Sequence, residues 1–327
     1  MVKALGLFSG GLDSILAVKL LQEQEIAVTG VNFVTPFFGP EKAEKTAREI
    51  KIPLIIKNIT AEHLEILLSP RHGYGAGMNP CIDCHMLMLK IAGKMMEEKG
   101  FDFIFTGEVL GERPMSQNKD SIRLVARRSG YQDYILRPLS AKLLEETIPE
   151  KEGRVDRSRL LDISGRQRKK QLEMAKRYRL KTVPAPASGC ILTDPGFSAR
   201  LKDLIKAVGK DVTAEEIELL KVGRHVKLDS GNKVIIGRHK ADNDIIEGME
   251  TPNYILLAPK GTRGPRCLIP KGLKGELLAR AVEICASYCS GIEGQEITFF
   301  AKRGAPGKVY KTIYSRNNRP KEFIGAN

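Results

Sequence analysis

Residues 9–14, with the sequence SGGLDS, constrain the fold of this chain more than any other stretch. An apolar run over residues 2–8 precedes them, and a helical pattern over residues 12–23 follows. A loop between a strand and a helix directs backbone N–H groups and the positive end of the helix dipole toward one point, where they can hold a phosphate. Gly10 and Gly11 would let the main chain approach that anion closely. The pattern predicts a nucleotide-binding site.

The polar side chains of this loop narrow the kind of nucleotide site. Ser9 and Ser14 offer hydroxyl groups, and Asp13 is suited to position a metal ion or to orient the loop. The loop contains no lysine, unlike the GxxxxGK(S/T) loop of enzymes that transfer a γ-phosphate, and it lacks the three-glycine dinucleotide fingerprint. The alternative interpretation is a solvated glycine turn.

Short apolar segments alternate with helical patterns through the first third of the chain. Such alternation is typical of βαβ units and predicts a parallel sheet with helices on both faces, an α/β fold. Further strands are expected at residues 26–34, 53–59, 101–105 and 134–139, and further helices at residues 41–50 and 82–99.

The length of 327 residues predicts two domains, because single cores rarely grow beyond roughly 250 to 300 residues. We place the domains at residues 1–205 and 206–327. In the second, Thr213 and Glu216 form a capping-box pattern, and residues 226–236 read as a hairpin that turns at residues 229–231. The second domain is therefore expected to be a smaller α+β domain.

The charge balance favours an anionic partner. The chain has 53 Lys and Arg against 39 Asp and Glu, a formal net charge of +14. Basic residues concentrate in residues 151–181, a stretch expected to be mostly helical, and in residues 301–327; each stretch is either a nucleic-acid contact or a solvated face. No apolar run is long enough to span a membrane and no signal peptide opens the chain, so we expect a cytoplasmic protein without a membrane partner.

Six cysteines divide into two groups. Cys267, Cys285 and Cys289 lie in apolar patterns and are expected to pack in the core. Cys81 and Cys84 form a CxxC pair and Cys190 follows far downstream, so three thiolates can hold a [4Fe-4S] cluster that keeps one iron open. The alternatives are a zinc site completed by His85, a catalytic persulfide resolved by a partner thiol, or buried unreactive cysteines.

The hexapeptide SGGLDS resembles the signature of the PP-loop, or N-type ATP pyrophosphatase, superfamily. The resemblance implies an adenine nucleotide alpha hydrolase-like fold that binds ATP and Mg²⁺. It also implies adenylation of a substrate oxygen, with release of pyrophosphate, before a nucleophile displaces AMP. By position, it places the adenine at the end of the second strand, at Asn32, Phe33 and Val34.

Two further segments resemble tRNA thiolases of this superfamily. Several of them carry a CxxC and a distant third cysteine that match Cys81, Cys84 and Cys190. The sequence TGEVLGE at residues 106–112 resembles the TGExLGQxxSQ segment of tRNA 4-thiouridine synthetases, with Ser116 and Gln117 in register and residues 112–115 departing from it. This segment places Thr106 and Gly107 at the ATP site and favours thiolation at carbon 4; a plain turn after a strand is the alternative.

The second domain resembles a protein family other than the tRNA thiolases. Residues 221–254, with GRHKADND from Gly237, are similar to the RNA-binding domain at the end of fibronectin-binding-like ribosome-quality-control proteins. A basic hairpin and tail suit phosphate contact, and a solvated hairpin is the alternative. The expected RNA contacts are Arg224, Lys227, Arg238, Lys240, Lys302 and Arg303.

Together these features predict an ATP-dependent tRNA sulfurtransferase that makes thiouridine. Its catalytic residues would be Asp13, Cys81, Cys84 and Cys190, with Ser9, Gly10, Gly11 and Ser14 at ATP. The partners would be tRNA and a sulfur donor, either sulfide or a persulfide-carrying protein. Two alternatives stay open: a PP-loop adenylating enzyme with a non-sulfur nucleophile, and a non-catalytic, nucleotide-sensing, zinc-stabilised RNA-binding protein. The uridine position and the oligomeric state also stay open, although related thiolases often form dimers.

Overall fold

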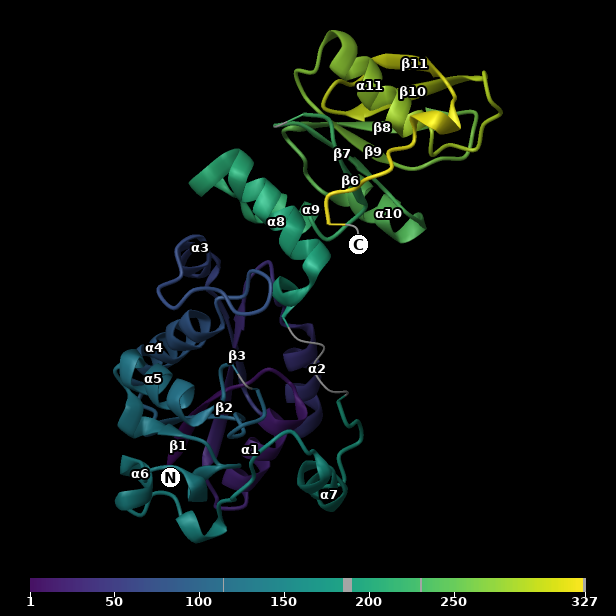
Figure 1. Ribbon diagram of the computed structural model, residues 1–327. Helices are drawn as coiled ribbons and strands as arrows, with labels where there is room; N and C mark the ends of the chain where they lie inside the picture. The colour runs from purple at the N-terminus through teal and green to yellow at the C-terminus, as the bar shows by residue number, and fades with distance from the viewer. Residues whose placement is uncertain (114, 185–189, 230, 326–327) are drawn as a thin grey trace. The chain divides into compact units, whose positions relative to one another are not determined.

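The computed structural model describes residues 1–113, 115–184, 190–229 and 231–325. The chain divides into two compact units, Met1–Thr193 and Asp194–Asn327 (Figure 1). Helix α8 (Pro195–Val208) belongs to the second unit, so the boundary expected after residue 205 falls inside this helix.

The first unit is built on a five-stranded sheet in which every strand pair is parallel, as the alternating pattern predicted. The strand order is β3-β2-β1-β4-β5. Phe103 and Phe105 pack into the core on one face of the sheet, and Ile104 packs into the core on the other. The strands are β1 (Lys3–Leu7), β2 (Ala27–Val34), β3 (Leu54–Asn58), β4 (Phe103–Thr106) and β5 (Ile135–Leu136).

Helices cover both faces of this sheet. Figure 1 shows α1 and α2 on one side and α4 and α5 on the other, in agreement with the two separate cores. Gly100, with φ at +67°, ends α4 as expected, because glycine adopts the left-handed conformation without strain. The helices are α1 (Leu12–Gln22), α2 (Glu41–Ile50), α3 (Thr60–Leu68), α4 (Cys81–Lys99), α5 (Lys119–Ser129), α6 (Ile148–Lys151) and α7 (Lys169–Arg177).

The basic stretch of residues 151–181 is less helical than predicted. It contains α7 and one short 3₁₀ turn at Arg157–Arg159, with irregular backbone between them. Some of its charge is paired within the fold, because Arg157 meets Glu150, Lys170 meets Asp162 and Arg177 meets Glu23. These pairs show that part of the basic charge stabilises the first unit.

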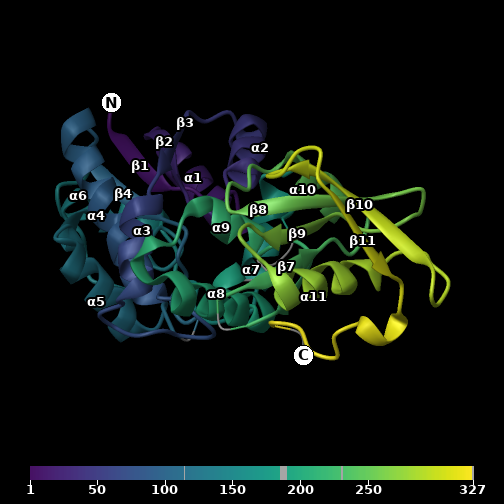
Figure 2. The same ribbon diagram turned by 90° about the horizontal axis from the view of Figure 1, so that it is seen from above.

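The second unit is an α+β domain with a six-stranded antiparallel sheet in the order β11-β10-β8-β9-β7-β6. Helix α11 (Gly275–Ala286) packs on one face, as Figure 2 shows, and α9 (Ala214–Leu219) and α10 (Lys240–Gly248) pack on the other. The strands are β6 (Arg224–Lys227), β7 (Lys233–Ile236), β8 (Tyr254–Lys260), β9 (Cys267–Pro270), β10 (Glu296–Arg303) and β11 (Val309–Ile313).

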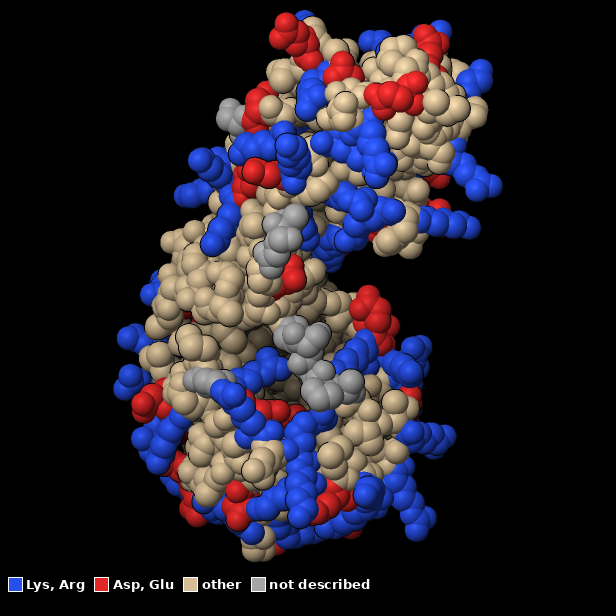
Figure 3. Space-filling view, turned by 45° about the vertical axis from the view of Figure 1, so that its right-hand side comes forward, with Lys and Arg blue, Asp and Glu red and all other residues tan. Residues whose placement is uncertain are grey.

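Local expectations for this unit are confirmed. Thr213 and Glu216 form the capping box that begins α9, and β6 and β7 form the hairpin; Ser230 of its turn lies outside the described residues. Cys267, Cys285 and Cys289 are buried in one apolar core. No helix in the described part of the chain is long and apolar enough to cross a membrane. On the face seen in Figure 3, Lys and Arg side chains are spread over both units.

Candidate active site

The phosphate loop and the TGE turn meet at the carboxyl ends of β1 and β4. These strands are neighbours, and the strand order changes direction between them, which is where ligands bind in parallel sheets. A Cβ on Gly107 would lie 2.5 Å from the backbone nitrogen of Ser14 and 2.7 Å from the carbonyl carbon of Asp13. The two motifs are therefore in direct backbone contact, and only glycine fits at residue 107.

The loop itself has the geometry that its glycines predicted. Gly10 has φ at +70°, and a Cβ there would lie 2.6 Å from the carbonyl oxygen of Lys42. Gly11 N donates to Ser9 Oγ at 3.3 Å, and Ser14 Oγ donates to Gly11 O at 2.8 Å. Lys42 Nζ lies 4.0 Å from the place that a Cβ on Gly11 would take. A lysine of α2, which the motif alone did not reveal, thus reaches the lysine-free loop.

The end of β2, where the adenine was expected, is largely used by the fold. Asn32 Nδ2 donates to Phe8 O at 2.9 Å, which ties β2 to the start of the phosphate loop. Phe33 is 4% exposed and packs in the core, while Val34 is half-buried. The main chain and Val34 are left to meet a ligand at this edge.

The three cysteines of the predicted site converge although they come from distant parts of the first unit. Cys81 and Cys84 lie in the first turn of α4, and Cys190 precedes a 3₁₀ turn whose Leu192 O accepts a bond from Met78 N at 2.9 Å. Burial, and then the charges of Cys190 and Cys81, raise the pKa of Cys84 well above its ordinary value. The three thiols are thus close enough for their charges to interact.

A series of groups with alternating charge runs from half-buried Cys81 and His85 to buried Glu108 and Arg137 at the end of the sheet. His85, one helical turn after Cys81, donates from Nδ1 to Glu108 Oε1 at 2.9 Å. Glu108 Oε2 accepts from Arg137 Nε at 2.9 Å and from Thr106 Oγ1 at 3.1 Å. Glu108 and Arg137 side chains are only 10% and 5% exposed. This series of hydrogen-bonded groups joins the start of α4 to the carboxyl ends of β4 and β5.

The charged groups next to Cys81 lower the pKa of its thiol. Burial alone would lower the pKa of His85, but its hydrogen bonds with Cys81 and Glu108 raise it to about 10. Burial alone would raise the pKa of Cys81, but the hydrogen bond and charge of His85, with Arg113, lower it below its ordinary value. The pKa of Glu108 is held well below its usual range by Arg137 and His85 against the effect of burial. Cys81 is therefore the thiol of the trio that loses its proton most readily, since burial raises the pKa of Cys84 and of Cys190.

Among the residues that the structure describes, no group of three or more His, Cys, Asp or Glu side chains is arranged to hold a single metal ion. His85 Nδ1 is bonded to Glu108, so a zinc ion could be bound only through Nε2 of this histidine. A [4Fe-4S] core is larger than one ion, and three converging thiols fit it in number and kind.

The predicted RNA contacts all lie in the second unit, and five of them also have internal partners. Arg224 lies over the Tyr288 ring at 5.5 Å, and Lys227, Arg238 and Lys302 form ion pairs with Asp203, Asp242 and Glu247 at 2.9, 2.6 and 2.8 Å. Arg303 donates to the carbonyl oxygens of Met249 and Glu247. Lys240, at the start of α10, is exposed and makes no ion pair with any residue described.

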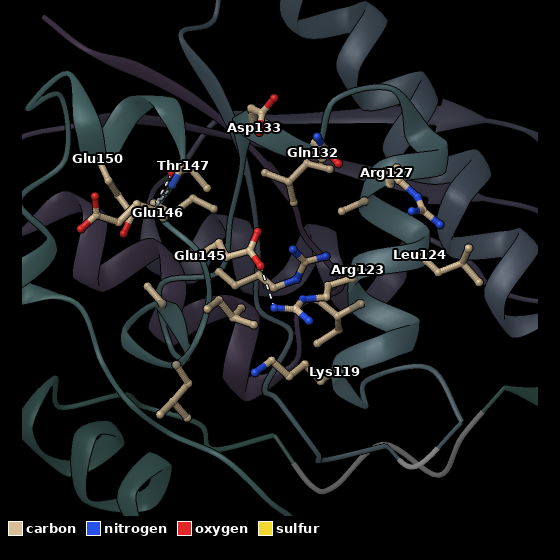
Figure 4. A pocket seen from close by; sticks show the side chains of 18 of the residues that line it. Lys119, Arg123, Leu124, Arg127, Gln132, Asp133, Glu145, Glu146, Thr147 and Glu150 are labelled. Carbon is tan, nitrogen blue, oxygen red and sulfur yellow. Dashed lines mark hydrogen bonds and ion pairs between the residues drawn. The ribbon is translucent and has the colours of Figure 1, made fainter.

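A separate groove of about 1290 Å³ lies beside β5. Figure 4 shows Arg123 of α5 reaching toward Glu145, with which it pairs at 2.6 Å, and Lys119 and Arg127 of the same helix also line the groove. Its lining includes Arg137 but neither the phosphate loop nor the cysteines. Basic and acidic side chains line this groove in similar numbers, so its lining has little net charge.

The fold and the site define a nucleotide-binding α/β domain joined to an α+β module. Residues 1–149 match the family model described as thiamine biosynthesis protein (ThiI), and residues 223–311 match the model described as NFACT protein RNA binding domain. The first unit thus carries a ThiI-type domain, which confirms the resemblance to PP-loop tRNA thiouridine synthetases, and the second carries an NFACT-type RNA-binding domain. No curated protein matches the chain by sequence.

Solved structures resemble part of the chain. One, described as a predicted subunit of a tRNA methyltransferase from Methanocaldococcus jannaschii, is 18% identical and covers 42% of this chain and 68% of its own, with a TM-score of 0.33. Another, a 4-thiouridine synthetase in complex with RNA and with bound ATP, is 25% identical, with a TM-score of 0.34. That match covers 42% of this chain and 36% of the synthetase.

Proposed function

We propose that this protein is an ATP-dependent tRNA sulfurtransferase, which adenylates a uridine carbonyl oxygen and replaces that oxygen with sulfur. One observation carries the proposal: the consecutive residues Gly107 and Glu108 connect the phosphate loop, where ATP would bind, to Cys81, where sulfur would be carried. Gly107 contacts the backbone of the phosphate loop, and Glu108 holds the His85 that stabilises the Cys81 thiolate. A sulfur carried at Cys81 and a nucleotide bound by the loop would therefore act on the same carbonyl group of the substrate, the sulfur on its carbon and the α-phosphate on its oxygen.

The first step uses the loop. ATP binds with its phosphates on the backbone amides of residues 9–14 and beside Lys42. Its adenine lies at the end of β2, against the main chain of Asn32 and Phe33 and against Val34. The uridine oxygen attacks the α-phosphate and pyrophosphate leaves, while the loop amides stabilise the charge that develops on it. Asp13 Oδ1 is buried and has no hydrogen-bond partner among the described residues, which suits a ligand of Mg²⁺.

The second step delivers sulfur to the activated carbon and expels AMP. Cys81, Cys84 and Cys190 would hold a [4Fe-4S] cluster, which supplies an open iron position for a sulfide ligand. The chain's own residues then orient this centre: Glu108 and Arg137 fix His85, and His85 fixes Cys81. Because the TGE segment resembles that of 4-thiouridine synthetases, we propose carbon 4 as the site of thiolation.

The His85–Cys81 pair favours a second way of carrying sulfur, a persulfide on Cys81. The terminal sulfur attacks the adenylated carbon, AMP leaves, and the uridine is joined to Cys81 through a disulfide. The thiol of Cys84 or Cys190 then gives up its proton, attacks Cys81 Sγ and releases thiouridine, which leaves a Cys81 disulfide for an external thiol to reduce. The sulfur donor would be sulfide in the first route and a persulfide-carrying protein in the second.

The second unit would bind the tRNA. We propose that the enzyme works in the cytoplasm. The NFACT-type domain supports RNA binding, and the contacts we propose are Arg224, Lys227, Arg238, Lys240, Lys302 and Arg303. Because it binds the RNA backbone, this domain would position the uridine without reading its sequence. A homodimer, in which one subunit's RNA-binding domain serves the other's active site, is the assembly we propose.

Release of pyrophosphate tests the adenylation step by itself. We expect pyrophosphate from Mg·ATP only when unmodified tRNA is present, in the wild type and in Cys190→Ala alike. Thionucleoside should form only in the wild type. Full thiolation by Cys190→Ala would favour a different nucleophile, and no pyrophosphate with any RNA would favour the non-catalytic binding protein. Protein prepared without air should be brown and bleach on exposure if the cluster forms, and colourless if the persulfide operates.

A further inference from the structure

Helix α7 belongs to residues 150–193, a segment that neither family model matches, yet it packs beside the phosphate loop. Ala175 of α7 shares a core with Leu16 of α1. At the far ends of the two helices, Arg177 pairs with Glu23 at 2.7 Å. At their near ends, Arg168 and Gln171 interact with Asp13. The helices therefore run parallel, and the start of α7 lies against the start of α1.

The polar groups at this junction are buried without being satisfied. Gln171 is completely buried, and its amide lies beside the Asp13 carboxylate, where it lowers the pKa of that group. Within the part of the chain that the structure describes, however, neither atom of this amide has a hydrogen bond of normal distance and angle. The same holds for Arg168 Nε and Asp13 Oδ1. A buried polar group without a partner costs roughly 1 to 3 kcal/mol, so such atoms are rare and several together indicate a missing ligand.

A hydrogen bond positions the side chain of Arg168, but no carboxylate among the described residues forms an ion pair with it. Its Nη2 donates to Pro184 O at 3.2 Å, and its charge acts on Asp13 and Glu112. Within the described residues, no carboxylate lies within 4 Å of its guanidinium. Burial raises the pKa of Asp13, and Arg168 opposes that rise from a distance longer than an ion pair. The cation is therefore positioned beside the loop and available to an anion.

A bound triphosphate requires such a cation. The loop of residues 9–14 has no Lys or Arg, and Lys42 supplies one positive charge from α2. An arginine can place two N–H groups on one phosphate, which a lysine cannot. Next to it, the Gln171 side chain offers an NH₂ group with two N–H donors and a carbonyl oxygen that accepts hydrogen bonds.

We propose that Arg168 and Gln171 bind the phosphates of ATP on the loop and complete a nucleotide site that the family segment alone leaves unfinished. This inference rests on the proposed use of ATP. Arg168 contacts the phosphate chain and offsets the charge that grows on pyrophosphate as it leaves. Gln171 satisfies its amide on the same ligand. The basic stretch thus contributes to the ATP site and not only to RNA contact.

Calorimetric titration of the full chain with Mg·ATP, pyrophosphate and adenosine tests the proposal. Arg168→Gln should weaken ATP and pyrophosphate about 10- to 100-fold and leave adenosine unchanged, because a charge-assisted bond to phosphate is lost. Arg168→Lys should recover part of the loss. Arg166→Gln, a change to an exposed arginine two residues away, should bind as the wild type does.

Gln171→Met distinguishes a ligand-binding amide from a structural one. If the amide serves no ligand, replacing it with an apolar side chain should leave ATP affinity unchanged and keep or raise the melting temperature. We expect ATP affinity to fall instead. Equal ATP binding by the wild type and Arg168→Gln, or a parallel loss of adenosine, would overturn the inference and leave the proposed function standing. A wild type that binds no ATP would overturn the proposed function itself.

Discussion

The Glu108 carboxylate lies 2.9 Å from Nδ1 of His85 and joins the end of β4 to the first turn of α4. Arg137 meets its other oxygen, so the buried carboxylate has a positive group on each side. Burial of a charge is tolerated only when it is paired in this way. The arrangement makes Glu108 responsible for the charge of His85, and through it for the charge of Cys81.

Replacement of Glu108 by Gln should therefore make Cys81 less reactive. Without the carboxylate, the pKa of His85 falls and the pKa of Cys81 rises, so less thiolate is present at pH 7. We expect alkylation of Cys81 by iodoacetamide to slow about tenfold, measured by peptide mass spectrometry on iron-free protein. Glu98→Gln, on the exposed end of α4, is the matched control. An unchanged rate in a folded Glu108→Gln protein would contradict the role of the pair.

Gly107→Ala should damage ATP binding without unfolding the sheet. The added Cβ would meet Ser14 N at 2.5 Å, so either the TGE turn or the phosphate loop has to move. We expect at least tenfold weaker binding of Mg·ATP by calorimetry, since a displacement of the loop misaligns several amides at once. Gly248→Ala meets no atom within 4 Å and has no left-handed backbone, so it should bind ATP normally. Normal binding by Gly107→Ala would show that the contact is not needed.

Acid should destabilise the second unit through His225. Burial, with Lys233 and Arg200 nearby, lowers the pKa of His225 to about 3, and its Nε2 donates to Val222 O at 3.0 Å. The unfolded histidine takes up a proton near pH 6.5 and the folded one does not, so this contribution is complete above pH 6.5 and is lost as the pH falls toward 3. We expect the wild type to lose about 2 kcal/mol between pH 7 and pH 5 from this group.

His225→Asn removes the titrating group and provides the comparison. Urea unfolding at pH 7 and pH 5, followed by circular dichroism, should show a smaller loss of stability in the variant, whatever its stability at pH 7. An equal loss in both proteins would show that other groups account for the acid sensitivity. Buried His63 in the first unit, with its pKa lowered to about 4 by burial, is unchanged in this comparison.

The basic residues that we propose as RNA contacts in the second unit should bind the RNA backbone. Lys227→Gln and Lys240→Gln together should weaken tRNA binding and reduce the slope of log K against log salt by roughly 1 to 2, because each phosphate contact releases a counterion. Fluorescence anisotropy with labelled tRNA over a range of salt measures both quantities. Lys99→Gln, at the end of α4 away from Cys81, should change neither. A slope unaffected by the double variant would place the RNA elsewhere.

Much of the first unit could be predicted because its signals are local. The strand and helix periods located β1, α1, β2, α2, β3 and α4 to within about two residues, and the loop motif lies where a phosphate site belongs. Helix α3 went unrecognised because it directly follows β3 with no separating turn signal. The hairpin of β6 and β7 was also local, whereas the pairing of β8 with β10 spans a helix and is set by tertiary packing.

The chemistry of the site depended on contacts that a sequence does not display. His85 entered the sequence interpretation only as a zinc ligand, because its bond to Glu108 crosses from a helix to a strand end. Arg168 was one basic residue among many in its stretch, and its place beside Asp13 follows from the packing of α7 on α1. Lys42 reaches the loop from the start of α2 in the same way. Long-range packing, not motif spacing, selects these three residues.

Nucleoside mass spectrometry of unmodified tRNA tests the central claim most directly. The tRNA is incubated without oxygen with the iron-reconstituted protein, Mg·ATP and sulfide, then digested. We predict 4-thiouridine with the wild type and with Cys289→Ala, whose cysteine lies in the second core. None should form with Cys81→Ala, Cys84→Ala or Cys190→Ala. Absence of any thionucleoside from wild-type protein that binds ATP and tRNA would contradict the account.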